Sequence, residues 1–489
     1  MRRPAVWILL LLGVLGVCAY SYAPLRKAVR EWLVSERKIL AWEGPAARTT
    51  GPNVLIVVLD ATRRDALSPY AGAGRNTPAA KALARQGIVF DSCFSAATFS
   101  GPSYASLLTG TWPATHGVLD HPEILGPENR TLLEVARETG YYTLFFTQHR
   151  YLRDRWGYPQ GALFYRYHPD AGVLESELEG WIRAHPGRPF FAFLALTDPH
   201  WPYQGGPAGE EARARLPARD QELLASSSPY DMKYGLEETG LSPQFAPTLR
   251  RLYQGEVEHD DHLVQRLLQS LEKTGRRQNT IVVYTADHGE TFGEHGFYFV
   301  HDCEIHAEVS QVPLIVSWPS RLHPGRVGTP VSLTDVYPSI AKWIGGDPGS
   351  LVEGRPLPLR DQAGSHSRIP VCFTRPLQTD RAGYRTIRER YPRKGPEGSS
   401  FMAAGDRWSL VLRPAVKGMA WEAFDRLKDP LQKKNLWAEA RNQPEILALK
   451  DRLEAFLTRY LEASRKKPAS QPSPEQKKEL EELGYLEDS

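Results

Sequence analysis

The stretch Val54-Leu55-Ile56-Val57-Val58-Leu59 decides the fold, and it runs directly into Asp60. An unbroken apolar run of this length, rich in β-branched residues, is typical of a strand buried on both faces of a parallel sheet. Similar runs follow with helical patterns between them, at residues 141–147, 190–197, 280–286 and 312–317. This alternation predicts an α/β domain built on a large, doubly wound, mainly parallel sheet.

The composition supports a globular chain with a sizeable core. Hydrophobic residues make up 41% of the 489 residues, which excludes whole-chain disorder and fibrous repeats. Lys plus Arg is 60 and Asp plus Glu is 57, a formal charge of +3, so there is no global signature of a nucleic-acid partner. The four cysteines cannot form a disulfide scaffold, and we expect Cys93, Cys303 and Cys372 to be buried thiols.

The chain divides into several segments on these patterns. Strand-like runs at 369–373 and 408–412, with an amphipathic helix at 444–460, predict a small C-terminal α+β unit. A stretch rich in Lys, Pro and Ser then precedes a short helical pattern. The predicted segments are 26–50 as a juxtamembrane helix and linker, 51–362 as the catalytic α/β domain, 363–462 as the C-terminal unit, and 463–489 as a linker with a short helix.

The N-terminus carries a possible membrane segment. Arg2 and Arg3 precede an uncharged run from residue 4 to residue 25, which is marginal to sufficient for one spanning helix. A cleaved signal peptide is the main alternative, but the run is long for one and lacks a clean cleavage site. We therefore expect residues 1–25 to be an N-terminal membrane anchor or signal segment, with the uncleaved anchor favoured.

Acidic residues and histidines recur where the predicted strands end. Asp60 follows the first strand, and Asp287-His288 follows the run at 280–286. Ligands bind at the carboxyl ends of strands in open parallel sheets. A single such acid usually caps a helix, but two carboxylates with an imidazole suit one divalent cation, Ca or, given His288, Zn or Mn.

A candidate nucleophile lies in Ser100-Gly101-Pro102-Ser103. Pro102 suits the start of a helix and Gly110 its end, so Ser100 would lie at a helix N-terminus. Free backbone N–H groups there favour an oxyanion or a tetrahedral anion, and a metal touching the hydroxyl would help to ionise it. A capping serine with no catalytic role is the alternative.

Taken together, these motifs resemble the sulfatase family of the alkaline-phosphatase superfamily over about residues 52–345. The matching stretches occur in the family's order and are 53–65, 100–110, 198–200, 253–261, 287–290 and 312–314, with weaker C-terminal matches at 424–430 and 483–485. The resemblance implies an alkaline-phosphatase-like fold, a divalent metal and a catalytic domain outside the cytoplasm.

The resemblance also implies roles for individual residues. Asp60, Asp287 and His288 would hold one metal, which Ser100 would also touch as the nucleophile. The histidines that would contact the transferred group or protonate the leaving group are His149, His200 and His301. The implied substrate contacts are Arg63, Tyr104, Arg150, His200 and His301.

Three departures from the family pattern bear on the chemistry. Ala61 stands where sulfatases usually have a second aspartate. The nucleophile position is Ser100, with Tyr104 where the maturation motif of a formylglycine enzyme has arginine. Gln148 replaces a lysine that binds sulfate in the family. An unmodified serine would form a seryl ester, as in phosphatases and phosphotransferases of the superfamily.

Three functions stay open on the sequence. The first is a metal-dependent hydrolase cleaving a sulfate ester through Ser100. The second is a phosphoester hydrolase or phosphotransferase using the unmodified serine, and the third is a membrane-anchored protein that binds without catalysis. The expected partners are a small-molecule, glycan or lipid ester and the membrane, with no nucleic acid; the oligomeric state is open.

Overall fold

A computed structural model describes most of the two folded units that the sequence predicts. The described residues are 36–39, 50–71, 74–120, 123–203, 210, 213–226, 242–361, 369–375, 398–415 and 418–466. The predicted anchor at 1–25 and the predicted C-terminal helix at 477–486 lie outside these ranges.

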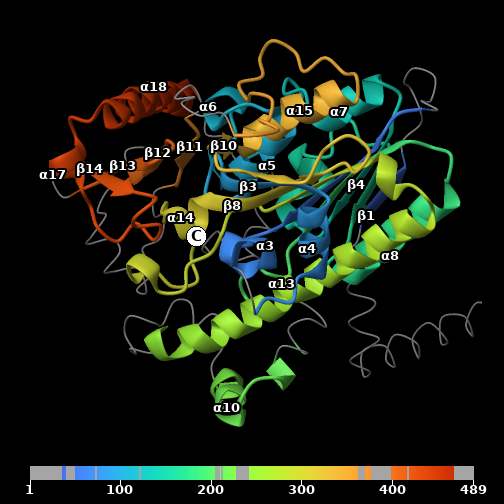
Figure 1. Cartoon of the computed structure of the whole chain (residues 1–489), viewed down its shortest axis with the longest axis horizontal. Helices are drawn as coiled ribbons and strands as arrows, with labels where there is room; N and C mark the ends of the chain where they lie inside the picture. The colour runs from blue at the N-terminus through green and yellow to red at the C-terminus, as the bar shows by residue number, and fades with distance from the viewer. Residues whose placement is uncertain are drawn as a thin grey trace, which may run out of the picture.

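One large mixed sheet forms the centre of the molecule (Figure 1). Its strand order is β1-β5-β4-β6-β2-β7-β8-β3-β10, and β9 pairs with β3. The strands are β1 (Glu36–Ile39), β2 (Asn53–Leu59), β3 (Gly87–Phe94), β4 (Tyr142–Thr147), β5 (Phe164–Tyr167), β6 (Phe190–Leu196), β7 (Thr280–Thr285), β8 (Gln311–Ser317), β9 (Gly325–Val327) and β10 (Val331–Ser332). The strands β5, β4, β6, β2 and β7 are parallel, whereas β8 is antiparallel to both β7 and β3. The predicted mainly parallel, doubly wound sheet is confirmed.

Strand β2 has both faces buried, as its unbroken apolar sequence predicts. Val54, Ile56 and Val58 join the hydrophobic cluster on one face, and the alternate residues of the strand join the cluster on the other. Successive strand residues point to opposite faces, so a strand between two helical layers needs apolar side chains at every position.

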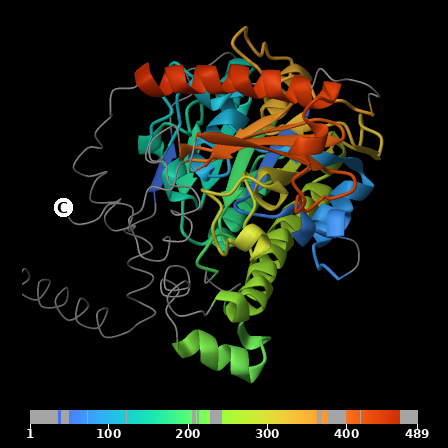
Figure 2. The same cartoon turned by 90° about the vertical axis from the view of Figure 1, so that its left-hand side faces the viewer.

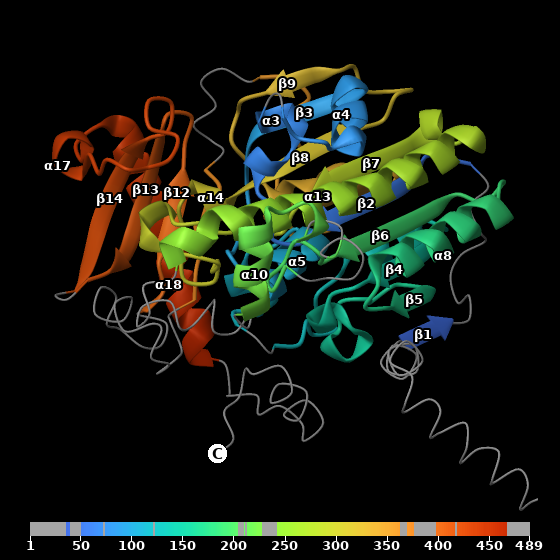
Figure 3. The same cartoon turned by 90° about the horizontal axis from the view of Figure 1, so that it is seen from below.

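Helices cover both faces of the sheet and thereby bury these two clusters. Figure 1 shows α7 and α15 above the sheet and α8 and α13 below it, and Figure 3 shows α8, α10 and α13 from the lower side. The helices of the large unit are α3 (Ser68–Ala71), α4 (Pro78–Arg85), α5 (Ser100–Thr109), α6 (Pro113–His116), α7 (Leu132–Glu138), α8 (Ala171–Ala184), α10 (Ala218–Ser226), α13 (Ser242–Lys273), α14 (Ala307–Ser310) and α15 (Val336–Trp343). Short 3-10 turns are η1 (Arg64–Ala66), η2 (Arg150–Leu152), η3 (Asp154–Trp156), η4 (Arg277–Asn279), η5 (Glu294–Gly296) and η6 (Leu333–Asp335).

A second, antiparallel sheet forms the C-terminal unit, as predicted. Its strands are β11 (Val371–Phe373), β12 (Phe401–Ala404), β13 (Trp408–Pro414) and β14 (Met419–Asp425), with α17 (Trp437–Ala440) and α18 (Pro444–Lys466). Figure 2 shows α18 lying across this sheet. Ile446, Leu449 and Leu453 of α18 share one hydrophobic cluster with the strands, so the helix stabilises the sheet by burying its apolar face.

Two expectations about the N-terminal part need correction. Glu36–Ile39, expected within a helix and linker, instead forms an edge strand antiparallel to β5. Its pairing is reinforced by an ion pair between Glu36 and Arg153 and by Arg37 lying over the ring of Phe164. These tertiary contacts override the helical pattern of a charged segment.

The expectation of a membrane-anchored chain is also corrected. Within the described ranges, no helix is both long and apolar enough to cross a membrane. The two longest helices, α13 and α18, carry charged side chains along their length, and such a composition opposes burial in lipid.

Candidate active site

Four predicted metal-site residues meet at the carboxyl edge of the central strands. Asp60 follows β2, Asp287 and His288 follow β7, and Ser100 is the first residue of α5. The Nε2 atom of His288 lies 3.3 Å from Ser100 Oγ, 3.3 Å from Asp287 Oδ2 and 3.7 Å from Asp60 Oδ1. One hydroxyl, two carboxylates and one imidazole therefore converge on a small buried space.

The hydrogen bonds of His288 orient its ring toward this space. The Nδ1 atom lies 2.9 Å from the carbonyl oxygen of Gly289, which can only accept a proton. Nδ1 therefore carries a hydrogen, and Nε2 is the ring nitrogen that faces Ser100 and the carboxylates. This is the arrangement of a metal-ligating histidine whose other nitrogen is fixed by a backbone carbonyl.

The two carboxylates have oxygen atoms that protein donors leave unsatisfied. Both oxygens of Asp60 and Oδ2 of Asp287 are buried without a hydrogen-bond partner among the described residues. Burial, followed by the charges of Asp287 and Glu290, raises the pKa of Asp60 well above its usual range, and burial also raises the pKa of Asp287. Buried carboxylates of like charge are costly unless a cation pairs with them.

This donor set fits a divalent cation. Ligand atoms of Asp60, Asp287 and His288 all lie within 4.8 Å of one another. Two carboxylates with one imidazole and one hydroxyl suit Ca through their oxygens and Zn or Mn through the imidazole.

The backbone around Asp60 is bent to bring the site together. Ala61 has a positive φ of 53°, which is uncommon for a residue with a side chain. Its N–H donates to Asp287 Oδ1 at 3.1 Å, and its carbonyl accepts from the Tyr253 hydroxyl at 2.9 Å. Ala61 therefore supplies a backbone donor to Asp287 at the position where a second aspartate was expected.

The loop after β7 lies close to the chain that leads into β8. Gly289 N–H donates to the carbonyl of Val309 at 2.8 Å. A Cβ atom at Gly289 would lie 2.0 Å from the carbonyl oxygen of Glu308, so only glycine fits. This close approach fixes the backbone directly beside His288.

Two further histidines lie beside the cluster. The ring of His301 stacks on that of His288 with centroids 4.1 Å apart, and His200 lies 5.1 Å from His301. His301 Nδ1 lies 3.4 Å from Glu290 Oε2, while His200 Nδ1 donates to the carbonyl of Trp201 at 2.6 Å. The carboxylate of Glu290 can therefore stabilise a protonated His301.

On another side of Asp60 lie His149 and Tyr104. His149 Nδ1 accepts from the N–H of Tyr151, so the ring hydrogen is on Nε2, which lies 3.1 Å from Asp60 Oδ2. The Tyr104 hydroxyl is buried without a hydrogen-bond partner among the described residues. Burial raises the pKa of Tyr104, so this hydroxyl stays a neutral donor.

Other residues expected at the site are placed elsewhere. The guanidinium of Arg63 pairs with Asp65 at 2.8 Å and with Glu294 at 2.9 Å, so its donors serve the loop. Arg150 is exposed at the start of η2. Gln148, at the position of the family's lysine, binds Asp198 through Nε2 and accepts from Thr197 N–H at 2.6 Å.

The structure also adds polar residues that the sequence did not single out. Asp260 of α13 is fully buried, and burial followed by the charge of nearby Asp198 raises the pKa of Asp260 well above its usual range. Burial raises the pKa of Asp198 to about 6. The only signal in the sequence was the pair Asp260-Asp261 on the apolar side of a helix. Asp261 itself accepts from the N–H groups of Ala79 and Ala80.

Comparisons with known proteins find one matching family and several similar sequences. Residues 52–346 match the sulfatase family. An ulvan-active sulfatase from Formosa agariphila is 24% identical over 470 residues, covering 84% of this chain and 81% of that relative.

Solved structures show the same fold. One of them is a protein solved in complex with its substrate, D-glucosamine-2-N,6-O-disulfate. It has a TM-score of 0.67 and 18% sequence identity, and the match covers 86% of this chain and 100% of that protein's chain. The phosphonate monoester hydrolase of Agrobacterium radiobacter has a TM-score of 0.64 at 19% identity, covering 84% and 96%.

Proposed function

The chain belongs to the sulfatase family, and on this premise we propose that it hydrolyses a sulfate ester with one divalent cation and a nucleophile at Ser100. The observation that carries the proposal is the convergence of Ser100 Oγ, His288 Nε2 and the buried carboxylates of Asp60 and Asp287, three of whose four oxygens accept no protein hydrogen bond among the described residues. Within this proposal, residues 51–362 are the catalytic domain and residues 363–462 the C-terminal unit.

Asp60, Asp287 and His288 would hold the cation, with Ser100 as a further ligand. A divalent cation bound there would favour the Ser100 alkoxide and withdraw negative charge from the transferred group. The protein's own part is to bring both carboxylates together in a buried site and to keep Nε2 of His288 directed inward.

The remaining chemistry follows from the positions of the side chains. Ser100 Oγ attacks sulfur in line, the new O–S bond forms, and the bond to the ester oxygen breaks. The N-terminal N–H groups of α5 face the transferred anion. His301, supported by Glu290, gives a proton to the leaving oxygen and later takes one from the water that hydrolyses the seryl ester.

We propose a sulfated glycan or a small aryl or alkyl sulfate as the substrate class. Support comes from relatives named for sulfated glycans, including the ulvan-active sulfatase. Tyr104, His149 and His200 flank the cluster and are the proposed contacts to the sulfuryl group. Arg63 and Arg150 lie outside the cluster, and we propose that they contact the part of the substrate farther from the sulfuryl group.

Phosphoester transfer is a second candidate, because two observations favour it. The donor set includes a serine hydroxyl where formylglycine enzymes use a modified residue, and the fold matches a phosphonate monoester hydrolase. An unmodified seryl ester could pass its group to water or to another acceptor.

A paired assay tests the proposal. The purified full chain is assayed with an aryl sulfate and the matching aryl phosphate, with and without added Ca, Zn and Mn, and the Ser100 peptide is weighed by mass spectrometry. We expect metal-dependent release of sulfate. A preference for the phosphate ester with unmodified Ser100 would support the second candidate. The absence of both turnover and bound metal would favour a protein that binds without catalysis.

A further inference from the structure

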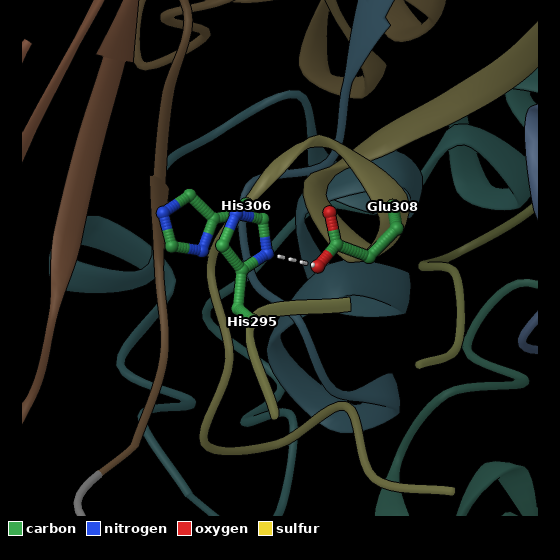
Figure 4. Close-up of side chains that lie close together, drawn as sticks. All are labelled: His295, His306 and Glu308. Atoms are coloured by element: carbon green, nitrogen blue, oxygen red, sulfur yellow. Dashed lines mark hydrogen bonds and ion pairs between the residues drawn. The ribbon is translucent and has the colours of Figure 1, made fainter. Parts of the chain in front are cut away.

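A second cluster of titratable side chains lies where the active-site loop meets the C-terminal unit. It consists of His295, His306 and Glu308, which Figure 4 shows together. The rings of His295 and His306 stack with centroids 3.6 Å apart and an angle of 12° between their planes. Neither the proposed reaction nor the metal at Asp60 uses these residues.

The contacts of His295 define its protonation state. Nδ1 lies 2.8 Å from Glu308 Oε1, and Nε2 lies 3.1 Å from the backbone carbonyl of Gln432. Both partners accept hydrogen bonds and neither donates one, so both ring nitrogens carry hydrogen. His295 is therefore an imidazolium that joins the loop after β7 to the C-terminal unit.

Charged side chains from several elements surround the two rings. The carboxylates are those of Glu304 on the loop, Glu308 on α14 and Glu422 on β14, and Arg413 on β13 supplies a guanidinium. Three carboxylates against one guanidinium leave an excess of negative charge, which favours the imidazolium form of His295. His306 Nδ1 already lies 2.6 Å from Glu304 Oε1.

A metal ion does not fit this cluster as it stands. An ion bound by two imidazoles lies near the plane of each ring, whereas these parallel rings lie face to face. His295 has no unprotonated nitrogen, and the guanidinium of Arg413 lies 3.3 Å from both nitrogens of His306.

The backbone at this junction is strained on both sides. His295 has φ 54° and Gln432 has φ 52°, and these two residues are the ones that the hydrogen bond joins. Such conformations cost about 1–3 kcal/mol each and persist where surrounding contacts hold them. Gln432 also accepts from the N–H of Ala307 through Oε1 at 2.7 Å.

We propose that His295, as an imidazolium between Glu308 and Gln432, clasps the loop of residues 287–306 to the C-terminal unit and thereby acts as a positioning residue for His301. The loop runs from Asp287 through His295 to His301, so movement at the clasp displaces the leaving-group side of the site. The catalytic consequence rests on the proposed function, whereas the clasp itself can be measured without it.

The contacts with Glu308 raise the pKa of His295 above its ordinary value, against the opposing effect of burial. A raised pKa in the folded protein means that the clasp stabilises fully below about pH 6.5, the ordinary histidine value. The stabilisation is lost as the pH rises through the higher folded-state pKa.

The test compares the full chain with His295→Asn, which tolerates the left-handed backbone and carries no charge at any pH. We expect His295→Asn to lower Tm by roughly 2–4 °C at pH 6 and to leave Tm unchanged at pH 9.5. Glu308→Gln should behave in the same way, and the exposed His323→Asn should show no such dependence. In the sulfate-release assay, His295→Asn should lower kcat roughly 10-fold and leave KM nearly unchanged, because a small misplacement of His301 slows proton transfer.

Two results would overturn the clasp. A Tm difference that is the same at every pH would show that His295 acts through packing alone. A second equivalent of bound metal that disappears in His295→Asn would show a metal site. Absence of turnover in the wild type would count against the proposed function and leave the Tm comparison intact.

Discussion

Ser100 is the nucleophile of the proposed reaction, and its surroundings make that role testable. Ser100 begins α5, and its hydroxyl lies 3.3 Å from His288 Nε2. We predict that Ser100→Ala abolishes turnover, a loss of at least about 10³-fold, while one equivalent of metal still binds through Asp60, Asp287 and His288. Turnover and metal content are measured on the same sample.

The matched control is Ser106→Ala, on the same helix. Ser106 Oγ lies 3.0 Å from His116 Nε2, outside the cluster. It should lose about 1 kcal/mol of stability and keep its turnover. Equal activity loss in both variants would show that the effect at Ser100 comes from damage to α5.

The proposed role of His301 predicts a dependence on the leaving group. Because protonation matters most when the departing alkoxide is strongly basic, His301→Gln should slow alkyl or glycan sulfates by roughly 10²–10⁴-fold. Aryl sulfates with acidic phenols should be slowed much less. An equal loss for both substrate types would assign His301 to binding.

The site residues were predictable where the strand pattern placed them. Asp60 and Asp287 follow apolar runs that had to be buried strands, and neighbouring parallel strands bring their ends together. Arg63 and Gln148 were not predictable, because their partners Glu294 and Asp198 come from distant parts of the chain. A long polar side chain has many possible partners, and only packing selects among them.

At the scale of elements, α4 begins where Asp261 of another helix caps it. The carboxylate accepts from Ala79 N–H at 2.8 Å, Ala80 N–H at 2.9 Å and the Tyr284 hydroxyl at 2.9 Å. Asp261→Ala leaves these buried donors unsatisfied and should cost about 2–4 kcal/mol. Chemical denaturation measures this, with Asp261→Asn, which keeps one acceptor oxygen, expected to lose less. A loss below 1 kcal/mol would contradict the capping role.

Strands differ in how well the sequence predicts them. The central strands β2, β4, β6 and β7 were predicted within a residue or two, because burial on both faces demands continuous apolar side chains. Strands β3 and β5 were missed because Asp91 and Arg166 interrupt their apolar runs. The edge strand β1 and the short strands β9 and β10 were also missed. Their side chains are charged or few, and their structure comes from pairing with a neighbouring strand.

At the scale of the whole molecule, the cation should stabilise the fold. Removing it leaves the carboxylates of Asp60 and Asp287 buried side by side without a partner. Binding at 100 times Kd contributes about 2.7 kcal/mol, so chelation should lower Tm by several degrees and readdition of metal should restore it. Differential scanning calorimetry checks this, and an unchanged Tm would argue that no ion binds there.

Fold class and the order of the two units were predictable from the alternation of patterns, and the small C-terminal α+β unit is confirmed. The junction between the units was not predictable. His295 contacts Gln432, and Arg413 contacts Glu304, across more than 100 residues of sequence. Such pairs join residues that carry no shared local pattern, so only the folded chain reveals them.

The most direct measurement is sulfate release from an aryl sulfate, followed while the metal-stripped full chain is titrated with a divalent cation. The account predicts that turnover rises with bound metal and saturates at one equivalent, and that Ser100→Ala binds the same equivalent without releasing sulfate. Full turnover by the metal-stripped chain, or by Ser100→Ala, would contradict it.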